Sequence, residues 1–178
     1  KSGYAILQNL LDWSRSQTGM LKIKTEQFNL KNLIDENILN LELFSSNKEI
    51  EILSEIDSGI HVIADKNMIN TVLRNLLSNA LKFSHRYSKV FIRAFEDNDS
   101  VIVSVKDQGV GIPSGDIDKL FRIDTKYSLP GTENEQGTGL GLKLSKEFIE
   151  KQGGRLWVVS EENKGSEFMF SIAGKNGN

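Results

Sequence analysis

Two amides and an ammonium lie at helical spacing within NLLSNALKFS (75–84): Asn75, Asn79 and Lys82. Residues three and four apart share one side of a helix, so these side chains form a narrow stripe. Amide oxygens are neutral hard ligands that suit a partly hydrated Mg²⁺, and a lysine one turn on can neutralise a phosphate oxygen. The stripe therefore predicts a metal and phosphate site. The alternative is the solvated edge of an amphipathic helix.

A second candidate is the segment DQGVGIP (107–113), which directly follows a strand pattern. Gly109 and Gly111 allow tight turns and the close approach of a ligand. The Asp107 carboxylate at the strand end can accept a hydrogen bond from an adenine amino group, whereas the guanine carbonyl would be rejected. An ordinary Asp-Gly turn is the alternative, because such turns are common.

Two further segments can contact phosphate. GTGLGL (137–142) opens a helix, where free backbone amides and the helix dipole favour an anion; a glycine-rich helix cap is the alternative. Its pattern matches neither the dinucleotide fingerprint nor the Walker loop. The polar stretch 122–136 has no helix or strand pattern, which is typical of a lid or of disorder. Arg122 and Lys126 within it could reach a phosphate, or remain solvated surface charges.

Composition excludes several other kinds of site. The 178 residues include 22 basic and 24 acidic side chains, so the charge favours neither nucleic acid nor an anionic membrane surface. The absence of cysteine excludes disulfides and thiolate metal sites, and two isolated histidines argue against a zinc cluster. No apolar run is long enough to span a membrane, and no secretory leader opens the chain. The chain starts in mid-pattern at Lys1, so we interpret it as part of a longer protein.

The elements that must position these segments follow from apolar periodicity and capping residues. We expect helices over 1–18, from the N-cap Asn29 to 46, from the N-cap Asp65 to 84, and over 140–152. Expected strands cover 21–28, 49–56, 60–64, 88–97, 100–107, 155–161 and 166–173. The predicted fold class is α+β, a two-layer sandwich with a mixed, largely antiparallel sheet on one side and helices on the other. We expect three parts: an N-terminal helix (1–19), a domain (20–174) and a disordered tail (175–178).

In this order, the motifs resemble those of the catalytic ATP-binding domain of bacterial sensor histidine kinases. That family shares a Bergerat-type superfamily with gyrase, heat-shock chaperone and mismatch-repair ATPases. NLLSNALKFS resembles the N box, DQGVGIP the G1 box, KLFRIDT (119–125) the F box and GTGLGL the G2 box. The closing GSEFMFSI (165–172) is similar to the family's last strand, and the match covers about residues 27–173.

The resemblance implies ATP and Mg²⁺ as ligands. Asn79 would hold Mg²⁺ with Asn75 close by, and Lys82 would contact phosphate. Asp107 would select adenine, with Ser166 joining it in a water-mediated contact. The implied ATP-binding set is Asn79, Lys82, Phe83, Asp107, Gly109, Gly111, Ile112, Arg122, Lys126, Gly137, Thr138, Gly139, Leu140, Gly141, Leu142 and Ser166.

Position 75 separates the activities within this superfamily. The resemblance implies that hydrolysing relatives carry a glutamate there, as the base that activates water. Asn75 cannot take a proton, and a neutral imidazole already presents a lone pair, so we favour a histidine kinase with Asn75, Asn79 and Lys82 as its catalytic residues. An ATP-driven conformational ATPase and a degenerate nucleotide-sensing module remain the alternatives.

The phosphoacceptor histidine is not found in this sequence. The family's acceptor lies on the first helix of a dimerisation hairpin, and residues 1–19 resemble only the end of its second helix. His61 in a predicted strand and His85 after the N box do not match that motif. We therefore expect ATP binding without efficient autophosphorylation. The expected partners are the hairpin helix, a response regulator and a second copy of the full-length protein, and the expected location is the cytoplasm.

Overall fold

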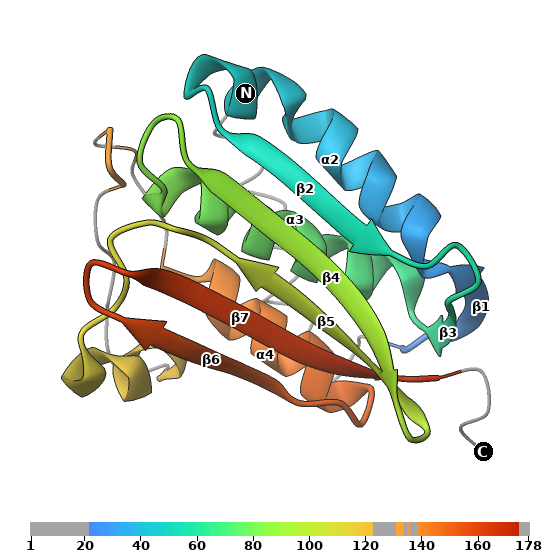
Figure 1. Ribbon diagram of the computed structural model, residues 1–178. Helices are drawn as coiled ribbons and strands as arrows, with labels where there is room; N and C mark the ends of the chain where they lie inside the picture. The colour runs from blue at the N-terminus through green and yellow to red at the C-terminus, as the bar shows by residue number, and fades with distance from the viewer. Residues whose placement is uncertain (1–21, 123–130, 134, 136–138, 175–178) are drawn as a thin grey trace.

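The computed structural model describes residues 22–122, 131–133, 135 and 139–174. One face of a five-stranded sheet is covered by helices, as Figure 1 shows, and the strand order is β2-β4-β5-β7-β6. The elements are β1 (Glu26–Asn29), α2 (Leu30–Asn47), β2 (Glu51–Ile56), β3 (His61–Ala64), α3 (Lys66–Phe83), β4 (Lys89–Asp97), β5 (Ser100–Lys106), the 3₁₀ helix η1 (Ser114–Phe121), α4 (Gly141–Lys151), β6 (Leu156–Glu161) and β7 (Gly165–Ala173). The expected two-layer α/β sandwich is confirmed.

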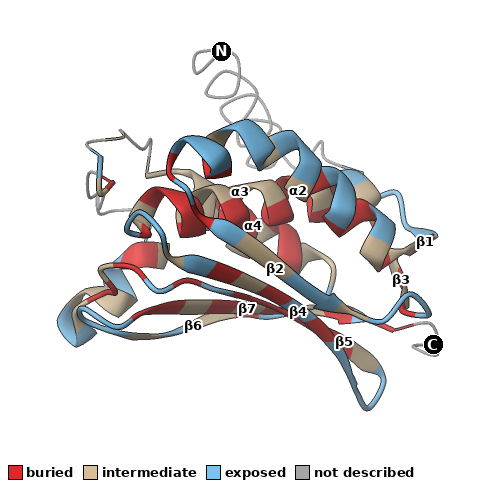
Figure 2. Cartoon of the chain, turned by 45° about the horizontal axis from the view of Figure 1, so that its top comes forward, coloured by how far each residue is buried: buried red, intermediate tan, exposed pale blue. Residues whose placement is uncertain are grey.

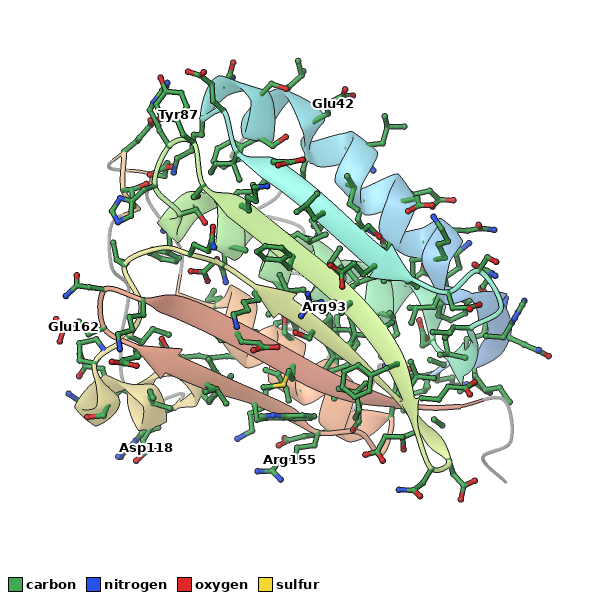
Figure 3. The ribbon with its side chains drawn as sticks, in the orientation of Figure 1. Glu42, Tyr87, Arg93, Asp118, Arg155 and Glu162 are labelled. Carbon is green, nitrogen blue, oxygen red and sulfur yellow. The ribbon has the colours of Figure 1, made fainter. Side chains whose placement is uncertain are left out.

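The sheet is mixed but largely antiparallel. β2 pairs with β4 in parallel, and every other pairing in this sheet is antiparallel. Alternating side chains of β4 explain why only one face is covered, because Val90 and Ile92 are buried against the helices while Arg93 and Phe95 are exposed. Arg93, labelled in Figure 3, lies on the open face and forms an ion pair with Glu55 of β2.

Helix α3 provides the largest part of the core beneath the sheet. Its expected apolar face is buried, with Ile69, Leu73, Leu76 and Ala80 each at most 4% exposed. In Figure 2 the buried residues gather where the helices face the sheet. The expected N-cap is confirmed, because the Asp65 side chain accepts hydrogen bonds from the backbone N–H groups of Asn67 and Met68.

Helix α2 and the small sheet β1-β3 close one end of the core. The N-cap Asn29 accepts a hydrogen bond from the backbone N–H of Asn32, as expected. Phe28 before the cap and Leu33 after it are both buried, as a hydrophobic staple requires. The strand expected over 21–28 is shorter in the structure, because β3 offers only four partners and pairing begins at Glu26.

Positive-φ residues mark the two hairpins that build the rest of the sheet. Asn98 has a φ of 53° in the expected two-residue turn between β4 and β5. Asn163 and Gly165 have positive φ values where β6 turns into β7. The strands β2 and β3 also lie where predicted, but they do not pair with each other, since β2 joins the large sheet and β3 pairs with β1.

Three expectations lie wholly or partly outside the described residues: the helix over 1–18, the N-terminal part of 1–19, and the tail 175–178. The helix η1 was not anticipated, because a single short 3₁₀ segment has no strong periodic pattern. Among the described helices, none combines the length and apolar character needed to cross a bilayer.

Replacing Asp65 with alanine tests the cap of α3. The carboxylate also accepts the backbone N–H of Lys24 at 2.8 Å, so the substitution leaves three buried or half-buried donors without this partner. We expect the free energy of unfolding to fall by about 2 kcal/mol, the upper end of the range for N-caps. Urea denaturation measures it. The matched cap variant Asn29→Ala should lose only about 1 kcal/mol, and an equal loss in both variants would contradict this account.

Candidate functional site

The predicted polar stripe of α3 faces the edge of the helical layer. Asn75 and Asn79 are half-buried, and Lys82 is only 8% exposed. Within the described part of the chain, no hydrogen bond holds the Asn79 amide. Its oxygen is therefore available to a ligand, and a neutral amide oxygen is a donor that Mg²⁺ accepts.

Asn75 joins α3 to the start of α4. Its Nδ2 donates to the Gly141 carbonyl at 3.2 Å and to Ser145 Oγ at 3.3 Å. Ser145 Oγ donates to the same carbonyl at 2.8 Å. Gly141 packs against the Asn75 side chain at ordinary van der Waals distance. The amide nitrogen of Asn75 is thus used to position α4, which leaves only its oxygen for a metal.

Close backbone contacts hold the loop after β5 against α3 and β6. A β-carbon on Gly109 would overlap the Phe83 carbonyl at the end of α3. Gly111, at a φ of 65°, leaves no room for a β-carbon against the Glu161 carbonyl. The backbone N–H of Val110 donates to the Phe83 carbonyl at 3.2 Å. Glycine is therefore required at both positions to bring the Asp107 loop onto the end of α3.

Asp107 is buried at the end of β5. Its Oδ1 accepts the backbone N–H groups of Gly109 at 2.9 Å and of Ser166 at 3.2 Å. Among the described residues, Oδ2 accepts no hydrogen bond. Burial raises the pKa of the Asp107 carboxyl from 3.8 to about 6, although the two backbone N–H groups oppose the shift. The carboxylate thus has one oxygen fixed by the protein and one available to a ligand donor.

Ser166 lies beside Asp107, as the resemblance implied. Its hydroxyl is 2.8 Å from Ser160 Oγ, which donates to the Gly165 carbonyl and accepts the backbone N–H of Ile112. In the arrangement that makes every one of these contacts a hydrogen bond, Ser166 donates to Ser160 and keeps its lone pairs. Those lone pairs can accept a proton from a water molecule next to Asp107.

Lys82 and Phe83 form the α3 side of the site. The Lys82 ammonium lies 4.7 Å from the centre of the Phe83 ring. Burial lowers the pKa of Lys82, and the Glu135 carboxylate opposes that shift. A partly desolvated ammonium attracts an anion more strongly than an exposed one, because less water screens it.

The start of α4 offers backbone donors. Leu140 is the N-cap residue, and no described side chain caps the helix. Gly139, with a φ of 68°, precedes it, and Gly141 and Leu142 form the first turn. Uncapped amides at a helix N-terminus favour an anion.

Some predicted ligands are not placed in this cluster. Lys126, Gly137 and Thr138 lie outside the described residues. Arg122 is exposed directly after η1, and Ile112 is buried in the loop beyond Gly111. His61 lies in β3 and His85 follows α3, as predicted.

The sequence analysis missed Lys48, Thr132 and Glu135. Lys48 ends α2, is 2% exposed and binds Glu135 Oε1 at 2.9 Å and Thr132 Oγ1 at 2.7 Å. The structure thus docks residues 131–133 and 135, part of the stretch predicted to be without structure. A single lysine at the end of a helix carries no sequence signal for this role, because it normally lies at the surface.

Together these groups fit an adenine nucleotide with a metal. One face supplies a buried carboxylate for an amino group, and the other supplies an amide oxygen, an ammonium and uncapped helix amides for phosphate and Mg²⁺. The four motifs are in direct contact, because α3 touches both α4 and the Asp107 loop, and that loop touches β7.

Comparison with known proteins agrees with this geometry. Residues 64–175 match the family described as histidine kinase-, DNA gyrase B-, and HSP90-like ATPase. The chain belongs to this family. It is a catalytic ATP-binding domain of the histidine kinase type, and ATP binding follows from the family.

Sensor kinases are among its relatives. The chain is 32% identical over 174 residues to the sensor histidine kinase GacS of Pseudomonas protegens, covering 94% of this chain and 19% of GacS. It is 39% identical over 150 residues to the adaptive-response sensory kinase SasA of Prochlorococcus marinus, covering 83% of this chain and 39% of SasA. The chain therefore spans well under half of these relatives.

A solved structure shows the same fold. The catalytic domain of histidine kinase ThkA superposes with a TM-score of 0.74 at 32% identity, covering 84% of this chain and 95% of that one. Since nearly all of the ThkA domain is matched, the described sheet and helices make up a full domain of this type.

Acidic pH should weaken adenine recognition. An adenine amino group binds the ionised Asp107, so affinity should fall as pH decreases through about 6, the pKa of this carboxyl. We expect adenosine affinity to fall about tenfold for each pH unit below that value. Adenosine is the ligand to titrate, by calorimetry or NMR, because nucleotide phosphates ionise in the same range. An affinity that stays flat from pH 7.5 to 5 contradicts the role of Asp107.

Asp107→Asn should bind less tightly but fold more stably. The Asn oxygen would keep the two backbone N–H bonds, which turns its NH₂ group toward the adenine amino group, and adenosine affinity should fall about 10- to 100-fold. Folding disfavours ionised Asp107, since its folded pKa is the higher one, so stability falls as pH rises from 3.8 to about 6. Urea denaturation at pH 7 should therefore show a gain for the Asn variant of up to about 3 kcal/mol.

The control is Asp57→Asn. Asp57 accepts the backbone N–H of Gly59 in the same Asp-x-Gly geometry, but at an exposed turn. Neither adenosine affinity nor stability at pH 7 should change in this variant.

Proposed function

We propose that this chain binds Mg-ATP and transfers the γ-phosphoryl group to a histidine of a dimerisation hairpin, for relay to a response regulator. Residues 1–19 would be the end of that hairpin, residues 20–174 the catalytic domain and 175–178 a tail. The full-length protein would be a cytoplasmic kinase core that forms a homodimer. The supporting observation is the chemistry of position 75, together with the sensor kinases among the relatives.

Asn75 supports transfer over hydrolysis. An amide cannot act as the base that activates water, and here its nitrogen is bonded to the first turn of α4. A neutral imidazole needs no such base, because its lone pair can attack phosphorus directly. When it does, the bond from the γ-phosphorus to the bridging oxygen breaks, ADP leaves, and the imidazole N–H proton passes to solvent.

The remaining residues would bind and orient the nucleotide. Asp107 would accept the adenine amino group, and Lys82 with the α4 amides would hold the phosphates. The oxygens of Asn79 and Asn75 would hold Mg²⁺, which neutralises charge on the β- and γ-phosphates. Catalysis would then consist of positioning and charge neutralisation.

The test mixes the chain with Mg-ATP and with a separately expressed hairpin that carries the acceptor histidine. Transfer predicts acid-labile, base-stable phosphate on the hairpin and little on the chain alone. Phosphate release without the hairpin would indicate a conformational ATPase instead. Nucleotide binding with neither product would indicate a nucleotide-sensing module.

Two variants of α3 make the assay specific. Asn79→Ala should lower transfer at least about tenfold, as expected when a metal site loses support. Asn67→Ala removes an exposed amide from the same helix and should have no effect. Equal rates in the two variants would contradict the assignment of Asn79 to the metal.

A further inference from the structure

A buried lysine ties the end of α3 to a distant part of the chain. The Lys48 ammonium donates to the carbonyls of Leu81 at 3.0 Å and Lys82 at 3.1 Å. It also donates to Thr132 Oγ1 at 2.7 Å and to Glu135 Oε1 at 2.9 Å. A charge buried this deeply is stable only when it is paired and hydrogen-bonded, and these four oxygens meet that requirement.

The residues on the far side of Lys48, namely 131–133 and 135, are called the anchor segment below. Its Thr132 backbone N–H donates to the Lys82 carbonyl at 3.1 Å, and Thr132 Oγ1 donates to the Ser84 carbonyl at 2.7 Å. In Figure 1 this segment lies beside the turn from α3 to β4, near the end of α2. Figure 3 labels Tyr87 in the same corner. The anchor segment therefore attaches to the last turn of α3.

The anchor segment also contacts the side chain of Lys82. A β-carbon on Gly131 would lie 2.6 Å from Lys82 Cγ, so the Lys82 stem occupies the space where a larger residue at 131 would project. The Gly131 N–H donates to the Glu135 carbonyl at 2.9 Å, which fixes the turn. Movement of the anchor segment would consequently release the Lys82 stem.

The charges are consistent with this arrangement. Burial raises the pKa of Glu135, but the hydrogen bonds from Lys48 and from backbone N–H groups outweigh it and hold the pKa below 4.5. Glu135 is therefore ionised at neutral pH. Its carboxylate opposes the loss of charge on Lys82.

We propose that Lys48 and Glu135 are positioning residues for the phosphate end of the nucleotide. Their ion pair holds the anchor segment on α3 and thereby fixes where the Lys82 ammonium lies. This inference rests on the Mg-ATP binding proposed above. A lysine that only capped α3 would need the Leu81 and Lys82 carbonyls alone, whereas Lys48 also binds Glu135, a residue 87 positions away.

Amide hydrogen exchange on the full chain without nucleotide tests the first step. In Glu135→Gln the charged bond from Lys48 becomes a weaker neutral one, so the Thr132 amide should exchange about fivefold faster. The control Glu133→Gln removes the same charge from the same segment. Glu133 pairs with the exposed Arg86 at 2.7 Å, and this variant should leave the exchange rate unchanged.

Ligand binding tests the second step, with ADP and adenosine as the probes. Glu135→Gln should weaken ADP binding about five- to tenfold, the lower end of the coupling expected between linked sites. Adenosine binding should not change, because Asp107 lies outside this network. In a Lys48→Met background, Glu135→Gln should have no further effect on ADP.

The outcomes are distinct. Unchanged exchange in Glu135→Gln, equal loss of ADP and adenosine affinity, or equal effects of Glu133→Gln and Glu135→Gln would each overturn the proposal. A wild-type chain that binds neither ADP nor adenosine would overturn the proposed function instead, while the exchange experiment would still report on the anchor segment.

Discussion

Backbone contact without intervening side chains holds this site together. The loop that carries Asp107 touches the Phe83 carbonyl through Gly109, the Glu161 carbonyl through Gly111, and Gly165 of β7 through the Asp107 carbonyl. A single methyl group at any of these glycines would push apart elements that come from distant parts of the chain. The carboxylate and the α3 stripe are neighbours because these contacts are possible.

The same site concentrates charges that folding alone would not favour. Asp107 is buried with one oxygen unused by the described protein, and Lys82 is desolvated beside an aromatic ring. Such groups cost stability until a ligand meets them, and proteins keep them where function requires it. The cost is borne by the apolar face of α3 and by the valines of β5, which are almost wholly buried.

Three elements share the work of supporting the phosphate end. α3 supplies the polar stripe, Asn75 draws the start of α4 against it, and Lys48 at the end of α2 holds the anchor segment on its last turn. Each link joins residues far apart in sequence, and each uses hydrogen bonds to backbone carbonyls. The geometry of the site therefore depends on helix packing, since none of these helices could place its groups alone.

The sequence by itself determined the elements and most of the chemistry. Caps at Asn29 and Asp65, apolar periods of two and 3.6, and turn residues at Asn98 act locally, so they can be read from neighbours along the chain. Only the tertiary structure decided that β2 pairs with β4, that Asn75 bonds α4, and that Lys48 reaches Glu135. These are contacts between distant segments, and their partners are selected by packing and burial, which leave no periodic pattern in the chain.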